Sequence, residues 1–153
     1  MPTFATKRPV PFTAAQMYAL VADVERYPEF LPMCTGLRVT SRAPSASGEE
    51  LIATMSVGYK SIRETFTTRV DLQPGLPGVD VAYLNGPFSH LDNRWRFINT
   101  PGGGSEIDFY INYAFRSALL GALVGSVFEQ AFRKFAVAFE ERARAVYGVA
   151  AKT

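Results

Sequence analysis

The sequence predicts an α+β domain in which a curved antiparallel sheet of about seven strands surrounds a long C-terminal helix. Between Gly36 and Phe115 apolar and polar residues alternate with a period of two, whereas after Ala118 apolar residues recur at helical spacing. Short segments rich in proline and glycine separate the alternating runs, and no repeat or linker divides the chain. We therefore expect one domain over residues 1–150.

The N-terminal part predicts a first strand followed by two short helices. Thr3–Val10 reads as a strand, and Ala14–Val24 has its apolar residues at helical spacing. Thr13 is a good N-cap, and Gln16 completes a capping box with it. The prolines in the following segment, Tyr27–Pro32, allow at most a single further helical turn.

The middle of the chain predicts about six strands joined by short turns. Each run has one apolar and one polar file, which is typical of an antiparallel meander with one solvated face. The turns are expected at four segments that contain proline or glycine: 44–48, 74–78, 85–87 and 101–104.

The last segment, Ala118–Tyr147, predicts a long amphipathic helix that ends at Gly148. Such a helix has to bury its apolar stripe, so we expect it in the concavity of the sheet. The expected stripe consists of Leu120, Val124, Val127, Phe128, Ala131, Phe135, Ala138 and Phe139. The expected solvent face opposite it carries Glu129, Arg133, Glu140 and Arg144.

Three segments resemble a known family. Asp23–Cys34, Asn85–Phe97 and Phe139–Gly148 are similar, in this order, to motifs of the START-like, polyketide-cyclase-like (SRPBCC) superfamily, in its branch of coenzyme-Q-binding proteins and ribosome-association toxins. The resemblance covers nearly the whole chain and implies the helix-grip fold of that superfamily. One departure is Met33, which occupies a position where the branch is expected to have tryptophan.

The resemblance implies two activities and does not choose between them. The first is binding of ubiquinone or a related polyprenyl lipid, by a carrier or chaperone that supports respiratory electron transport. The second is regulation of ribosome association through the large ribosomal subunit. A third alternative is a small cyclase or dehydratase, because enzymes also occur on this scaffold.

Composition and charge narrow the class of protein further. Sixteen basic and fourteen acidic residues leave a net charge of +2, so we expect no DNA partner. A single cysteine, Cys34, and a single histidine, His90, allow neither a disulfide nor a His/Cys zinc cluster. We expect no metal and no cofactor, and no enzymatic activity, because the sequence offers no nucleophile–base pair.

The apolar segments indicate where the protein is expected to work. The longest uncharged stretch, Ser117–Phe128, has twelve residues, whereas a membrane span needs about twenty. No apolar run follows Lys7 and Arg8, so we expect no signal peptide and a cytoplasmic protein, with peripheral contact at the inner membrane left open. The uncharged stretch is either a helix end covered by loops or a portal that touches a bilayer.

The aromatic file on the predicted sheet and the helical stripe suggest a cavity between them, the alternative being a close-packed core. The hydroxyl groups of Tyr83 and Tyr113 would suit a quinone carbonyl. The expected ligand-binding residues are Phe66, Tyr83, Trp95, Phe97, Phe109, Ile111, Tyr113, Val124, Phe128, Ala131 and Phe135. The expected cavity mouth consists of Tyr27, Pro28, Phe30, Leu31, Pro87, Phe88, Leu120 and Leu123.

Overall fold

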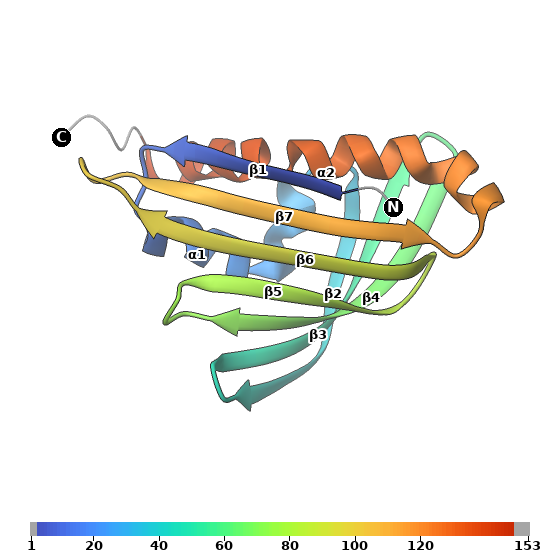
Figure 1. The fold of residues 1–153 in the computed structure, drawn as a ribbon, viewed down its shortest axis with the longest axis horizontal. Helices are drawn as coiled ribbons and strands as arrows, with labels where there is room; N and C mark the ends of the chain where they lie inside the picture. Colours follow the sequence, from blue (N-terminus) through green and yellow to red (C-terminus); the bar gives the residue numbers. More distant parts are fainter. Residues whose placement is uncertain (1–2, 149–153) are drawn as a thin grey trace.

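A computed structural model describes residues 3–148 as a curved antiparallel sheet that wraps around a long helix (Figure 1). Residues 1, 2, 149 and 150 of the predicted domain lie outside the described residues. The elements are β1 (Thr3–Val10), α1 (Ala14–Ala22), η1 (Val24–Glu29), β2 (Cys34–Ser45), β3 (Gly48–Tyr59), β4 (Ile62–Gln73), β5 (Gly78–Asn85), β6 (Phe88–Asn99), β7 (Ser105–Phe115) and α2 (Ala118–Tyr147).

The seven strands form one sheet in the order β1-β7-β6-β5-β4-β3-β2. Strands β2 to β7 follow one another as a meander, and β1 pairs with β7 at the far edge. Register shifts place extra residues in β2, β5 and β6, and such irregularities bend a sheet. Strands β2, β3 and β4 consequently turn away from the direction of β5, β6 and β7 (Figure 1). The predicted α+β class, with its curved sheet and C-terminal helix, is confirmed.

Helix α2 lies in the concavity and packs on β1, β7 and α1. Of the predicted stripe, Val124, Phe128 and Ala131 are buried, whereas Leu120 and Phe135 are half-buried. Four residues outside that stripe are also buried: Phe132, Ala136, Glu140 and Ala143. The buried side of the helix is wider than predicted because α1 packs on it as well as the sheet.

The expected solvent position of Glu140 is wrong. Its side chain is only 7% exposed, and its carboxylate accepts hydrogen bonds from Arg8 of β1 and from Arg144 one turn further along α2. A buried carboxylate requires such partners, since burial without them is costly. The helical projection missed this position because Arg8 comes from the other end of the chain.

The N-terminal helices match the prediction except at one boundary. The capping box of Thr13 and Gln16 is present, but α1 ends at Ala22 instead of Val24. Val24 belongs to the 3-10 helix η1, where it and Tyr27 turn toward the core. Arg142 of α2 fastens this segment, because its guanidinium lies 2.6 Å from a Glu29 carboxylate oxygen and 4.9 Å from the Phe30 ring centre.

Candidate ligand-binding cavity

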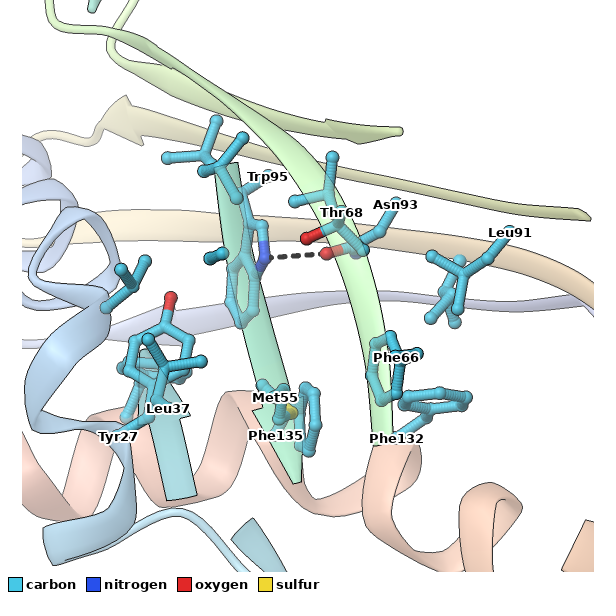
Figure 2. Close-up of a pocket in the computed structure, with 17 residues that line it drawn as sticks. Tyr27, Leu37, Met55, Phe66, Thr68, Leu91, Asn93, Trp95, Phe132 and Phe135 are labelled. Atoms are coloured by element: carbon cyan, nitrogen blue, oxygen red, sulfur yellow. Dashed lines mark hydrogen bonds between the residues drawn. The ribbon is translucent and has the colours of Figure 1, made fainter. Parts of the chain in front are cut away.

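A cavity of about 60 Å³ lies between the concave sheet face and α2 (Figure 2). Its wall is almost entirely apolar: Thr68 and Asn93 are the two lining side chains that are neither aliphatic nor aromatic. The lining residues are Val24, Tyr27, Leu37, Ala53, Met55, Phe66, Thr68, Val70, Val79, Val81, Leu91, Asn93, Trp95, Ile111, Phe132, Phe135 and Phe139.

The size of the cavity sets what it can hold without rearrangement. A volume of about 60 Å³ accommodates a few water molecules, whereas pockets for small-molecule ligands usually enclose about 300–1,000 Å³. Leu37, Met55 and Phe135 line the cavity and are only half-buried, so its wall reaches the surface between β2, β3 and the middle of α2. Methionine is flexible enough to move aside, and this opening is where a larger ligand would enter.

The two polar side chains differ in how they are held. The Asn93 amide donates to the Tyr110 carbonyl oxygen at 2.9 Å and accepts from the Trp95 indole N–H at 3.2 Å, so its orientation is fixed. Thr68 is 7% exposed, and its hydroxyl makes no hydrogen bond to any residue between 3 and 148, although it is not among the fully enclosed oxygens, of which Ser105 Oγ is the one without a partner. Figure 2 shows both groups on the cavity wall.

The expected ligand-binding residues fall into two groups. Four of them line the cavity: Phe66, Trp95, Ile111 and Phe135. The other seven lie in the surrounding packing and not on the wall: Tyr83, Phe97, Phe109, Tyr113, Val124, Phe128 and Ala131.

The tyrosine hydroxyls that we expected to face a quinone are placed differently. The Tyr83 hydroxyl accepts a hydrogen bond from the Phe88 backbone N–H at 3.0 Å. Tyr113 packs against Phe132, with ring centres 5.0 Å apart, behind the cavity wall. Burial raises the pKa of Tyr113, which keeps its hydroxyl neutral.

The expected mouth near the Asn85–Phe88 loop is closed by an aromatic cluster. Pro87 is buried, and Phe88 is 1% exposed. Five rings lie with their centres 5.0 to 5.9 Å from the ring centre of Phe88: Phe66, Tyr83, Tyr113, Phe115 and Phe128. This end of the sheet is therefore filled by side chains.

The remaining mouth residues lie at separate places along α2. Tyr27 lines the cavity and, with Phe30, packs on Phe139. Phe88 packs on Phe128. At a rise of 1.5 Å per residue, Phe128 lies about 16 Å from Phe139 along the helix. The two segments that we expected to share one rim are thus apart, because η1 folds onto the C-terminal half of α2. Of the others, Leu31 is buried, Pro28 is exposed, Leu120 is half-buried and Leu123 is 62% exposed.

Several lining residues were missed by sequence reasoning, although part of the signal was present. Five of the lining residues belong to the apolar files of the predicted strands, but the expected binding residues on the sheet were chosen mainly among the aromatic ones. These five are Ala53, Met55, Val79, Val81 and Leu91. Thr68 and Asn93 occupy positions in those same files, and a polar residue in an apolar file indicates a buried polar group. Leu37, Val24, Val70, Phe132 and Phe139 also line the wall.

Cys34 and His90 lie outside the cavity lining. Cys34 is buried, and desolvation raises the pKa of its thiol to about 11. His90 is half-buried on β6, where its Nε2 atom is bonded to the Asn112 side-chain oxygen.

We expect Cys34 to resist alkylation, because only the thiolate reacts. With a pKa of about 11 instead of about 8.5, the thiolate fraction near pH 8 falls by about 100-fold or more. Iodoacetamide labelling followed by mass spectrometry should therefore be at least that much slower for the folded protein than in denaturant. The rate should rise as the pH approaches 11, and fast labelling of folded protein near pH 8 would contradict the burial of this thiol.

A curved antiparallel sheet that grips a C-terminal helix around an apolar cavity defines the helix-grip class of proteins. The chain belongs to the family described as "Polyketide cyclase / dehydrase and lipid transport", which it matches over residues 10–140. No helix within residues 3–148 is long and apolar enough to cross a bilayer.

Two relatives represent the two kinds of protein in the predicted branch, a ribosome association toxin and a coenzyme Q-binding protein. The ribosome association toxin RatA of Escherichia coli K12 is 34% identical over 147 residues, which cover 96% of this chain and 90% of that protein. The mitochondrial coenzyme Q-binding protein COQ10 homolog B of Xenopus laevis is 30% identical over 141 residues, covering 90% of this chain and 56% of that protein.

Solved structures show the same fold. The 18 kDa protein CC1736 of Caulobacter crescentus is 34% identical, with a TM-score of 0.78, and the match covers 97% of this chain and 100% of that one. The Zhui aromatase/cyclase of Streptomyces shares the fold at 16% identity, with a TM-score of 0.79 and 99% of each chain covered.

Proposed function

We propose that this protein binds ubiquinone or a related polyprenyl lipid between the sheet and α2, as a carrier or chaperone that supports respiratory electron transport. The observation that carries the proposal is the cavity wall, whose polar side chains are Thr68 and Asn93 together with Tyr27 and Trp95, and the last two are already hydrogen-bonded within the protein. An apolar pocket with a few polar groups is the usual form of a small-molecule site. The relative named as a coenzyme Q-binding protein supports the same ligand class.

The chemistry of the wall supports binding without catalysis. Among its lining side chains, Tyr27 is the one with an ionisable oxygen, and its hydroxyl donates to the Val21 carbonyl oxygen. Burial raises the pKa of Tyr27 well above its usual value, so it is a poor general acid or base near neutral pH. An aromatase or cyclase reaction needs such a group beside its substrate.

Trp95 supplies a direct test, because it is the single tryptophan of the chain and lines the cavity. A quinone accepts an electron from an excited indole and quenches its fluorescence on contact. Titration with a short-chain ubiquinone should give saturable quenching at one quinone per protein. Quenching no stronger than that of free tryptophan amide, together with no quinone in an organic extract of freshly purified protein, would refute the proposal.

Ribosome association is the second candidate function, and the relatives named as ribosome association toxins support it. On the convex sheet face Arg69, Arg94 and Arg96 lie within 4 Å of acidic side chains, which reduces the positive potential available to ribosomal RNA there. Sedimentation with purified large ribosomal subunits tests this function. Co-sedimentation of protein emptied of lipid would support it, and absence from the subunit fraction at low salt would count against it.

We further propose a transient bilayer contact at the start of α2. Leu119 and Leu123, one helical turn apart, are 71% and 62% exposed, and Arg116 precedes them. Replacing Leu123 with glutamate should reduce flotation with vesicles of anionic phospholipid by several-fold, since the carboxylate opposes insertion and is repelled by the lipid charge.

Leu76, which is 57% exposed on the β4–β5 turn, provides the matched control. Leu76→Glu introduces the same change at an exposed leucine elsewhere on the protein, and its flotation should equal that of the wild type. Equal flotation of the Leu123→Glu variant would remove the bilayer contact from the proposal.

A further inference from the structure

Thr68 is a buried residue whose hydroxyl borders the cavity and has unused hydrogen-bonding capacity. Thr68 lies on β4 between Phe66 and Val70, two residues from each, so all three side chains point to the concave face. More than nine-tenths of the residue is buried, and its hydroxyl has no hydrogen bond to any residue between 3 and 148. Among those residues Ser105 Oγ is the fully enclosed side-chain oxygen without a partner, so the Thr68 oxygen, which is not fully enclosed, borders the cavity that its side chain lines. Buried hydroxyl groups are normally bonded, so an unpartnered one on a cavity wall indicates a partner that comes from outside the chain.

Asn93 adds a second donor to the same wall. Its cross-strand neighbour on β5 is Val81, which itself pairs with Val70 on β4, and all three side chains line the cavity. Its amide uses one N–H for the Tyr110 carbonyl and its oxygen for the Trp95 indole. A primary amide has two N–H groups, so one remains available in a side chain whose orientation is already fixed.

We propose that Thr68 and Asn93 form a head-group subsite that takes the uncharged ring carbonyl of a quinone. This inference rests on the proposed function and specifies how its ligand is recognised. A carbonyl oxygen has two lone pairs and no proton, so it accepts from the Thr68 hydroxyl and from the free Asn93 N–H. The cavity of about 60 Å³ has to widen for this, by movement of the half-buried Leu37, Met55 and Phe135, and the remainder of the wall then contacts the ring and the first isoprenoid units.

The same wall argues against a charged polyprenyl ligand. None of the seventeen lining residues is Lys, Arg or His, so a polyprenyl phosphate would bury its charge without a cationic partner. Recognition therefore depends on neutral hydrogen bonds. The class of ligand is a neutral, carbonyl-bearing isoprenoid.

Thr68→Val tests the subsite, because valine keeps the shape of threonine and removes the hydroxyl. We expect the affinity for a short-chain ubiquinone, measured by calorimetry, to fall by about 2- to 13-fold, the range of one neutral hydrogen bond. The affinity for an alkylbenzene with the same tail and no carbonyl should change by less than about twofold. The melting temperature should be unchanged or higher, since an unpartnered hydroxyl is lost.

Thr65→Val is the matched control, because Thr65 is exposed on the opposite face of the same strand. It should leave both affinities unchanged. Geranyl phosphate should not compete with the quinone for the wild-type protein. Equal quinone affinity of Thr68→Val and wild type, or effective competition by geranyl phosphate, would overturn the subsite while leaving lipid binding intact. If the wild type binds neither the quinone nor the alkylbenzene, the proposed function itself fails.

Discussion

Replacing Phe88 with alanine is expected to lower the free energy of unfolding by about 3–5 kcal/mol, the range for a fully buried phenylalanine. Phe88 is 1% exposed, and five aromatic rings surround it with centres at 5.0 to 5.9 Å. These rings come from β4, β5, β7 and α2, so the cavity left by the substitution has little freedom to collapse. Urea denaturation monitored by circular dichroism measures the change.

Phe135→Ala provides the comparison. Phe135 is half-buried at the cavity opening, so truncating it enlarges an existing space and exposes little new surface. We expect a loss of about 1–2 kcal/mol, in the ordinary range for point substitutions. A loss of less than about 1 kcal/mol for Phe88→Ala, or equal losses for both variants, would show that the aromatic cluster is not packed as described.

Replacing Ala53 with phenylalanine is expected to weaken quinone binding by more than about tenfold, because the new ring fills the cavity and has to be displaced. Ala53 is buried on β3 with its methyl group on the cavity wall. Quenching of Trp95 fluorescence by a short-chain ubiquinone measures the effect. The larger side chain should itself cost about 1–3 kcal/mol of stability if the wall has to move.

Ala82→Phe is the matched control, since Ala82 is exposed on β5 and belongs to the convex face. It should leave quinone binding and stability near those of the wild type. If Ala53→Phe proves too unstable to assay, Ala53→Leu makes a smaller change of the same kind. Undiminished quenching in a folded Ala53 variant would mean that the quinone binds elsewhere.

The elements of the fold were predictable because their signals are local. Alternation places Ala53 and Met55 on one face of β3 whatever surrounds the strand, and the capping box at Thr13 depends on residues three apart. The two helical misjudgements, at Val24 and at Glu140, both involve contacts with segments distant in sequence. Val24 turns onto the core, and Glu140 pairs with Arg8 of β1.

The candidate site was predictable only in part. Which side chains face the concave side follows from the period of two, so Phe66, Trp95 and Ile111 were found. Which of those side chains border empty space depends on how closely α2 approaches each part of the sheet. Phe109 and Tyr113 share a strand and a face with Ile111, yet they lie in packed regions.

The sequence by itself determined the α+β class, the strand and helix order and the family, because periodicity, turn residues and motifs are properties of neighbouring residues. Only the tertiary structure decided where the cavity lies, where its wall reaches the surface and which polar groups remain available in it. Those features arise from the curvature of the sheet and from the docking of η1 and α2, which bring Leu37, Met55 and Phe135 together from three separate elements. Hydrogen-bond partners are likewise set across strands, so the unused hydroxyl of Thr68 becomes recognisable once every neighbour is in place.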